Sequence, residues 1–109
     1  MVKIVWTELS VEDLREIFDY ISKNSTQYAK IIIDRIYKRA NQISSNPKSG
    51  RIVPEIDDES LRELIVGNYR LIYYIVNEYR VDILRVYHSA GSFSDIKIKV
   101  TTQVSNAEF

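Results

Sequence analysis

The stretch LRELIVGNYRLIYYIVNEYRVDILRVYH, residues 61–88, decides the fold of this chain. It holds three runs rich in branched aliphatic and aromatic residues, which are typical of β-strands. The three runs are residues 61–66, 69–76 and 81–88. Gly67 and Asn68 separate the first two, and both residue types tolerate the positive φ of a tight hairpin turn. Residues 77–80 provide a second turn, so the stretch predicts an antiparallel meander of three strands.

Two segments upstream of the meander show the three- and four-residue apolar spacing of amphipathic helices. The first is expected to begin at an N-cap, Ser10, and to run to about Lys23. The second is expected to be capped by residues 24–26 and to run to about Ser45, because the residue before Pro47 is disfavoured in a helix. The short connection between them predicts an antiparallel helical hairpin.

These elements together predict a single domain of the α+β class. Residues 2–6 form a short β-type run that can join the edge of the meander. The expected fold is therefore this N-terminal strand and the helical hairpin, packed on one face of an about four-stranded antiparallel sheet. Residues 51–56 are expected to be an edge or irregular segment because they contain a proline. The domain is expected to span residues 1–91, with residues 92–109 as a C-terminal extension of uncertain structure.

The composition excludes several classes of site. The 109 residues include no cysteine, which excludes disulfides and thiolate metal sites. The lone His88 excludes a multi-histidine metal centre, and no cofactor or metal is expected. Fifteen basic and fifteen acidic residues cancel, which disfavours a generic nucleic-acid binder. No apolar run has the ~18 residues of a membrane helix and no signal peptide is evident, so a cytoplasmic protein without membrane contact is expected.

The strand at residues 69–76 is apolar on both faces. A helical hairpin can cover only one face, and the second face of an antiparallel sheet is usually polar. The face that carries Ile72 and Tyr74 is therefore predicted to be a partner surface. The alternative is that residues 51–59 and the C-terminal segment cover it.

The same residues resemble a known family. The run SGRIVPEIDDESLRELIVGNYRLIYYIV, residues 49–76, followed by VDILRVYH, residues 81–88, is similar to the core signature of RelE/ParE toxins. That signature has Gly-Arg, Pro-Glu and Leu-Arg-Glu before a Tyr-Arg-Leu-Ile-Tyr strand, and it ends in Ile-x-x-Val-x-His. Trp6, Asp13-Leu14 and Tyr20-Ile21 also fit the family pattern, and the resemblance covers about residues 2–90.

The resemblance implies the toxin component of a type II toxin–antitoxin system, which inhibits growth and is neutralised by a cognate antitoxin in a possible hetero-oligomer. The residues expected to bind the target or the antitoxin are Arg51, Arg62, Ile72, Tyr74, Arg85 and Tyr87.

Two targets divide this superfamily: RelE-like members cleave mRNA, usually on the ribosome, and ParE-like members inhibit DNA gyrase. If the chain is an enzyme, the resemblance implies a metal-independent mRNA endoribonuclease. Glu55 would then take the 2′-OH proton, Arg70 would stabilise the phosphorane, and His88 would protonate the leaving oxygen. The alternative is that Glu55 is a loop carboxylate, that Arg70 forms a structural ion pair with it, and that His88 packs at a strand end.

Three features favour the ParE-like target: the chain is not basic, it has no lysine between Lys48 and Lys97, and its predicted helical hairpin is long. Relatives often have an arginine where this chain has Gly91. That departure supports a third hypothesis, an attenuated binding module without toxicity.

Overall fold

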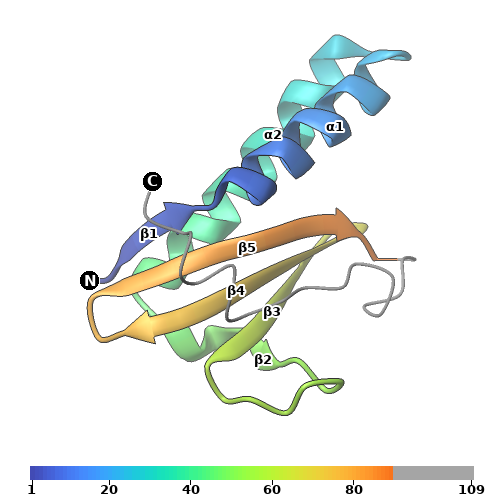
Figure 1. Ribbon diagram of the computed structural model, residues 1–109. Helices are drawn as coiled ribbons and strands as arrows, with labels where there is room; N and C mark the ends of the chain where they lie inside the picture. The colour runs from blue at the N-terminus through green and yellow to red at the C-terminus, as the bar shows by residue number, and fades with distance from the viewer. Residues whose placement is uncertain (90–109) are drawn as a thin grey trace.

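The computed structural model describes residues 1–89, and the expectations for Gly91 and for residues 92–109 lie outside them. In chain order the elements are β1 (Lys3–Trp6), α1 (Glu8–Ser22), α2 (Thr26–Asn41), the 3-10 turns η1 (Gln42–Ser44) and η2 (Pro47–Ser49), β2 (Arg51–Ile52), β3 (Leu61–Val66), β4 (Tyr69–Asn77) and β5 (Arg80–His88). The two helices form an antiparallel pair against a curved sheet, so the predicted α+β class is confirmed (Figure 1). No helix among the described residues is long and apolar enough to cross a membrane.

The sheet has five strands in the order β1-β5-β4-β3-β2. The meander of β3, β4 and β5 is antiparallel, as predicted. The sheet differs from the expected four antiparallel strands in two ways: β2 adds a two-residue strand, and β1 pairs with β5 in parallel. A parallel neighbour requires a long connection, and the helical hairpin provides it after β1.

The cap of α1 differs from the one predicted, whereas the cap of α2 lies within the predicted residues 24–26. The hydroxyl of Thr7, not that of Ser10, accepts a hydrogen bond from a backbone N–H of the first turn of α1, at 3.2 Å. Ser10 lies inside the helix and is buried. In α2 the cap is Ser25, whose hydroxyl accepts from the backbone N–H of Tyr28 at 3.0 Å. Neighbouring polar residues compete for each cap, and the backbone conformation of the entering chain decides between them.

The first hairpin turn matches its prediction in part. Gly67 has a φ of 60°, which fits a turn with glycine at its first central position. Asp57 is the one non-glycine residue of positive φ in the described range, so Asn68 does not use the left-handed region. The predicted end of the second helix, near Ser45, corresponds to the end of η1 at Ser44.

The main core lies between the helical hairpin and the sheet. Its fully or nearly fully buried members are Ile32, Ile36, Ala40, Ile43, Leu64, Val66, Leu71, Tyr73, Val81, Ile83 and Val86. Alternate residues of β3, β4 and β5 supply the sheet's share of this core, as period-two patterning requires.

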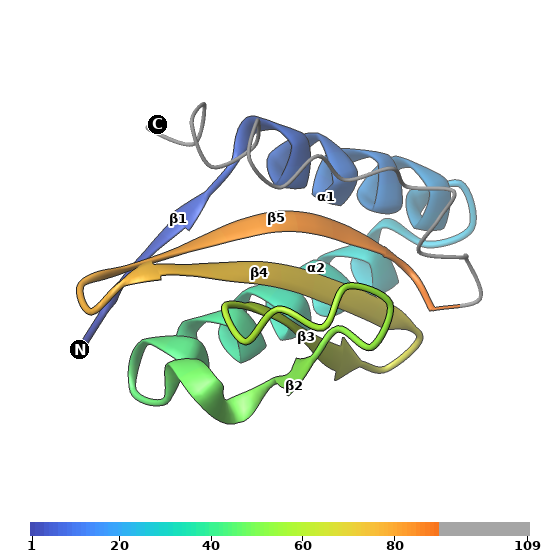
Figure 2. The same ribbon diagram turned by 60° about the horizontal axis from the view of Figure 1, so that its bottom comes forward.

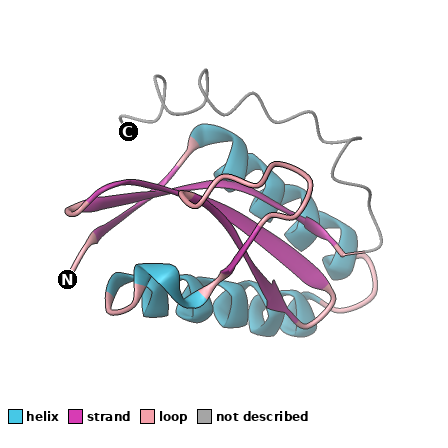
Figure 3. Ribbon diagram, turned by 90° about the horizontal axis from the view of Figure 1, so that it is seen from below, coloured by secondary structure: helices cyan, strands magenta, loops and turns pink. Residues whose placement is uncertain are grey.

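A second apolar cluster lies on the other face of the sheet and contains Val53, Leu61, Ile72, Leu84 and Tyr87. Figure 2 shows the β2–β3 loop lying across β4 on the side turned away from α2, and Figure 3 shows the same loop from below. Ile72 and Leu84 are fully buried, and burial of such a side chain contributes about 1.5–3 kcal/mol. The prediction that Ile72 lies on an uncovered apolar face is therefore wrong. Tyr74 packs against this cluster and is half-buried.

Candidate functional site

The outer face of the sheet, opposite the helices, carries a cluster of three charged residues: Arg51, Glu63 and Arg70. The Glu63 side chain is fully buried and lies between the two arginines. Arg51 Nε donates to Glu63 Oε1 at 2.7 Å, and Arg70 Nε donates to Glu63 Oε2 at 2.8 Å. A second nitrogen of Arg70, Nη2, also contacts Oε2. The buried carboxylate thus has a cation on each oxygen, which is the arrangement that a buried charge needs.

Arg70 also stacks on an aromatic ring, because its guanidinium lies 5.5 Å from the ring centre of Tyr87 on the neighbouring strand. Burial lowers the pKa of Arg70, but the hydrogen bond and charge of Glu63 outweigh it, so the net pKa is raised. The charges of Tyr87 and Glu55 add to this rise. Glu55 is exposed in the β2–β3 loop, and its charge also contributes to the raised pKa of Tyr87. Arg70 is therefore a permanently charged group that is already paired.

His88 lies on the opposite face from Arg70. Across the β4–β5 ladder Arg70 pairs with Tyr87, and the preceding residue, Tyr69, pairs with His88. Successive residues of a strand point to opposite faces, and the rings of Tyr69 and His88 meet edge to face at 5.6 Å. Arg70 thus lies on the outer face, across which the β2–β3 loop that carries Glu55 runs, whereas His88 belongs to the helix face. The structure does not bring the three predicted catalytic residues together on one face.

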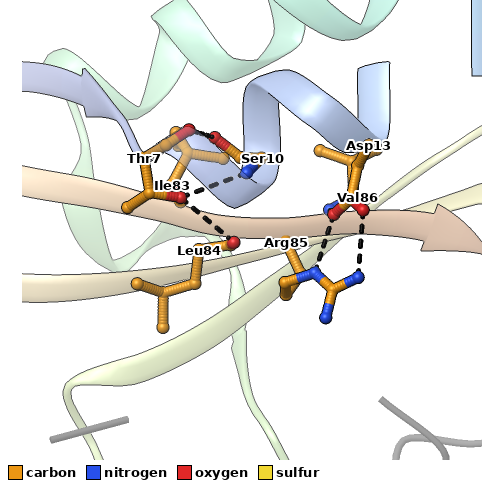
Figure 4. Close-up of polar contacts among 7 residues, drawn as sticks. All are labelled: Thr7, Ser10, Asp13, Ile83, Leu84, Arg85 and Val86. Atoms are coloured by element: carbon orange, nitrogen blue, oxygen red, sulfur yellow. Dashed lines mark hydrogen bonds and ion pairs between the residues drawn. The ribbon is translucent and has the colours of Figure 1, made fainter. Parts of the chain in front are cut away.

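On the helix face, the side chains of Thr7, the N-cap of α1, and of Asp13 in α1 bond to the backbone of β5 where its pairing with β1 ends (Figure 4). The β1–β5 pairing ends at Ile83. The Thr7 hydroxyl donates to the carbonyl of Ile83 at 2.7 Å and to that of Leu84 at 3.2 Å. Further along, Asp13 Oδ2 accepts from the backbone N–H of Val86 at 2.9 Å. These side chains replace the backbone partners that a longer β1 would supply.

Asp13 is buried and also holds Arg85 in a two-point contact. Arg85 Nε donates to Oδ2 at 2.8 Å, and Arg85 Nη2 donates to Oδ1 at 3.0 Å. The hydrogen bond to Asp13 raises the pKa of Arg85, although partial burial lowers it somewhat. Arg85, predicted to bind a partner, is thus positioned by a residue of α1.

A groove of about 540 Å³ lies between α1 and the end of β5, and we call it the α1–β5 groove. Its lining is Asp13, Glu16, Ile17, Tyr20, Tyr69, Arg85, Val86, Tyr87 and His88. Burial raises the pKa of Tyr69, and nearby Tyr28 and Tyr20 raise it further. The groove therefore combines neutral aromatic walls with carboxylates of α1.

Arg62, another predicted binding residue, holds the backbone on both sides of β2. Its Nε donates to the carbonyl of Glu59 at 2.9 Å, and its Nη1 donates to that of Gly50 at 3.0 Å. Gly50 has no room for a Cβ, which would stand 2.7 Å from the hydroxyl oxygen of Tyr73 and 2.6 Å from the backbone oxygen of Glu63. Packing thus requires glycine at position 50, directly before Arg51.

The sequence analysis did not identify the roles of two buried carboxylates. Glu63 holds Arg51 and Arg70 on the outer face, and Asp13 holds Arg85 and the backbone of Val86 beside α1. Glu63 occupies a position of the strand where the alternation calls for an apolar residue. A charged residue at such a position is the signal that could have indicated a buried ion pair. Asp13 fits the family pattern, but the pattern does not indicate its partner. Its pairing with Arg85 joins residues 72 apart in sequence, which no local pattern indicates.

Comparison with known proteins places the chain in a family. The family described as ParE toxin of type II toxin-antitoxin system, parDE, matches residues 4–93. Toxin RelE2 of Caulobacter vibrioides is 33% identical over 90 residues, which cover 83% of this chain and 98% of that protein.

Two solved structures share the fold. One is described as the chromosomal ParDE TA system from P. aeruginosa, with a TM-score of 0.67, 19% identity, and coverage of 81% of this chain and 96% of that one. The other is the toxin-antitoxin complex RelBE2 from Mycobacterium tuberculosis, with a TM-score of 0.58, 23% identity, and coverage of 80% and 96%. Given the family match and the RelE2 relative, the chain belongs to the ParE toxin family of type II toxin–antitoxin systems.

Proposed function

We propose that this chain is a growth-inhibiting toxin that a cognate antitoxin neutralises, and that it inhibits DNA gyrase rather than cleaving mRNA. The observation that carries the choice of target is the separation of Arg70 and His88 onto opposite faces of the sheet. General acid–base cleavage needs its acid, its base and its cation within hydrogen-bond reach of one phosphate. Arg70 is also engaged by Glu63, which limits its freedom to follow a developing charge.

An antitoxin partner is supported by the family and by the two structural relatives, whose descriptions name toxin–antitoxin systems. The partner is the product of a short gene adjacent to that of this chain. The two proteins, co-expressed with a tag on one, are expected to copurify and to restore growth. A toxin whose growth defect persists with that neighbour co-expressed would contradict this part of the proposal.

The choice of target is tested by inducing the chain in a host and measuring both mRNA integrity and plasmid supercoiling. We expect supercoiling by purified gyrase to fall while transcripts stay intact. His88→Ala is expected to leave growth inhibition unchanged, because His88 has no catalytic task in this proposal. Arg70→Lys keeps the charge beside Glu63 and serves as a matched variant that should retain toxicity if the fold is intact.

The alternative is the metal-independent mRNA endoribonuclease with Glu55, Arg70 and His88 as its catalytic residues. The feature that favours it is the electrostatic effect of Glu55 on Arg70, whose pKa it helps to raise. Transcript cleavage that disappears in His88→Ala and in Glu55→Gln, with supercoiling unaffected, would establish this alternative. A chain that binds its antitoxin but changes neither readout would be the attenuated module.

A further inference from the structure

β3 has an open edge beyond its short pairing with β2, which involves only Arg62 and Glu63 of β3. The carbonyl of Leu61 accepts from the backbone N–H of Val53, on the β2 side, at 3.1 Å. The backbone groups of every second residue after Leu61 point to the same side, and these residues include Glu63 and Ile65. Within residues 1–89 no strand or turn pairs with the backbone of Ile65 on that side. The N–H and C=O of Ile65 are therefore available to another extended chain.

A groove of about 580 Å³ lies between this open edge and α2, and we call it the α2–β3 groove. Its walls include Ile31 of α2 and Ile65 of β3, whose side chains are largely accessible because the residues are 45% and 52% exposed. Its cations are Arg35, Lys38 and Arg39 of α2. The groove thus combines accessible aliphatic side chains with a row of positive charges.

The positive charges of the groove exceed its negative charges. Asp34 is the one carboxylate among the lining residues, and it pairs with Lys38 at 3.0 Å. Arg39 donates to the neutral amide of Gln42 at 2.8 Å. Arg35 forms no ion pair within the described part of the chain. The charges of Arg35 and Arg39 are therefore uncompensated and attract carboxylates.

The alternation of β3 determines which side-chain pattern fits the groove. Leu64 and Val66 belong to the core beneath the helices, so Ile65 points to the outer face. In a strand paired with β3, the residue opposite Ile65 also points to the outer face. Its two neighbours point to the helix face, on the side of Arg35 and Arg39. An extended segment with an apolar residue between two acidic residues satisfies both faces.

A second copy of this chain fits the open edge poorly. Twofold pairing of β3 with its counterpart would place both α2 helices on the same face of the joined sheet. Each α2 carries four basic residues and one aspartate, so like charges would face one another across the pair. The charge of the groove therefore favours an acidic segment of a different protein.

We propose that the α2–β3 groove binds an extended acidic segment of a partner protein. The backbone of the segment pairs with the N–H and C=O of Ile65, an apolar residue packs beside Ile65, and the flanking carboxylates bind Arg35 and Arg39. Strand addition of this kind takes its affinity from main-chain hydrogen bonds and its specificity from alternate side chains. The inference concerns a surface of the chain itself and does not depend on whether the target is gyrase or mRNA.

The probe is the end-blocked peptide Glu-Val-Glu-Val-Glu, added to the isotope-labelled full chain and followed by NMR. We expect the amide signals of Ile65 and Val66 and the side-chain Nε signal of Arg35 to shift, while the amide of Glu12 in α1 stays in place. The matched control peptide, Lys-Val-Lys-Val-Lys, should leave the Ile65 and Arg35 signals unchanged. No shift with the acidic peptide, or equal shifts with the two peptides, would overturn the proposal.

A modified peptide tests the strand pairing without altering the protein. N-methylation of both valines removes the N–H groups that would pair with Ile65 and leaves the charge of the acidic peptide unchanged. The methylated peptide should therefore no longer shift the Ile65 amide. A shift of the same size with both acidic peptides would show that no strand pairing occurs, which contradicts the proposal.

Charge variants test the role of the two arginines at physiological ionic strength. Arg35→Glu with Arg39→Glu should weaken binding of the acidic peptide by about tenfold or more, because two attractive contacts become repulsive. The matched control, Lys3→Glu with Lys30→Glu, makes the same change in net charge outside the groove, where salt screens it from the peptide. Equal weakening in the two variants would mean that only the overall charge attracts the peptide, and the groove would not be the binding site.

Two other occupants are outcomes of the same experiment. A change of the Ile65 signal with protein concentration, in the absence of peptide, would identify a second copy as the occupant and overturn the proposal. A single-stranded DNA oligonucleotide that binds at Arg35 and Ile65 more tightly than the peptide would identify a nucleic acid, with the same consequence. Gyrase inhibition is measured without the peptide, so the proposed function and this proposal fail separately.

Discussion

Asp13 of α1 and Arg85 of β5 form a two-point ion pair that also fixes a backbone amide, because Asp13 Oδ2 accepts from both Arg85 Nε and the N–H of Val86. The pair joins a helix near the start of the chain to its last described strand, and the Arg85 side chain is 21% exposed. It stabilises the contact between α1 and β5 at the point where β1 no longer covers the edge of β5.

Replacing Asp13 with alanine is expected to destabilise the fold by about 3 kcal/mol, the lower end for removing one partner of a buried pair. Two groups lose their acceptor, the guanidinium of Arg85 and the backbone N–H of Val86. Urea unfolding followed by circular dichroism measures the change. Asp13→Asn keeps an acceptor for the N–H of Val86, so its loss should be smaller.

The matched control is Glu12→Ala, one position earlier in the same helix. Glu12 pairs with Arg15 at 3.0 Å, but both side chains are more than half exposed. Such a pair contributes only about 0–1 kcal/mol. Equal losses in Asp13→Ala and Glu12→Ala would show that the contact between α1 and β5 does not depend on the ion pair.

The two arginines that bind Glu63 should contribute differently to the stability of the fold. Arg70→Ala is expected to cost about 3 kcal/mol, because it leaves a buried carboxylate with one partner and its own side chain is only 12% exposed. Arg51→Ala should cost about 0–1 kcal/mol, because the Arg51 side chain is 65% exposed and water can replace it. Thermal unfolding of the two variants gives the comparison, and the reverse order would contradict the described geometry.

Alkaline pH should weaken the fold through Tyr73. Burial raises the pKa of Tyr73, although the hydrogen bond from Gly50 N–H and the charges of Arg62 and Arg39 oppose the rise. In the unfolded chain tyrosine titrates near 10. The folded state therefore binds the proton more tightly, so this contribution to stability is complete below about pH 10 and is lost as the pH rises through the folded pKa.

Tyr73→Phe should make stability above about pH 10 less sensitive to pH, as measured by urea unfolding at a series of pH values. Burial also raises the pKa of Tyr69 and of Tyr87, so part of the dependence should remain. At neutral pH the variant should lose about 1–3 kcal/mol, because the Tyr73 hydroxyl accepts from Gly50 N–H at 2.9 Å and donates to the Pro47 carbonyl at 2.6 Å. An unchanged alkaline profile would mean that Tyr73 ionises as freely in the folded state as in the unfolded chain.

Unlike Tyr73→Phe, the variant Tyr87→Phe should not lose stability. The Tyr87 hydroxyl is buried and has no hydrogen-bond partner within the part of the chain that the structure describes. An unsatisfied buried hydroxyl costs about 1–3 kcal/mol, so its removal should leave the unfolding midpoint unchanged or raise it. The phenyl ring keeps its contact with the Arg70 guanidinium. A loss of stability as large as that of Tyr73→Phe would mean that the Tyr87 hydroxyl has a partner in solution.

The meander could be predicted because its determinants are local. Alternating residues, Gly67 in the turn and proline at residue 54 each act within a few positions. The parallel pairing of β1 could not be predicted, because a strand's direction in the sheet depends on the helices between it and its neighbour. The burial of Ile72 could not be predicted from the alternation either, because Ile72 packs in one cluster with Val53 of the β2–β3 loop and Leu61 of β3.

The predicted site likewise combines features that a local motif indicates with features that depend on the three-dimensional fold. The motifs selected Arg70, Tyr87 and His88, and these residues lie on the paired strands β4 and β5. The motifs did not indicate that Arg70 and His88 point to opposite faces of the sheet. A motif gives the order of residues along the chain and not the direction of their side chains. The partner of Arg70 was expected to be Glu55, and the structure shows it to be Glu63, which the register of β3 against β4 brings alongside.

The way Thr7 and Asp13 cover β5 also bears on how the chain avoids self-association. The hydrogen bonds from Thr7 and Asp13 to β5 are few. They break more readily than the continuous ladder of hydrogen bonds that a neighbouring strand would form. If α1 separates from the sheet, the end of β5 becomes an open template for another strand, although the meander behind it is intact. A substitution that weakens the contact between α1 and β5 is therefore expected to favour aggregation through the exposed end of β5.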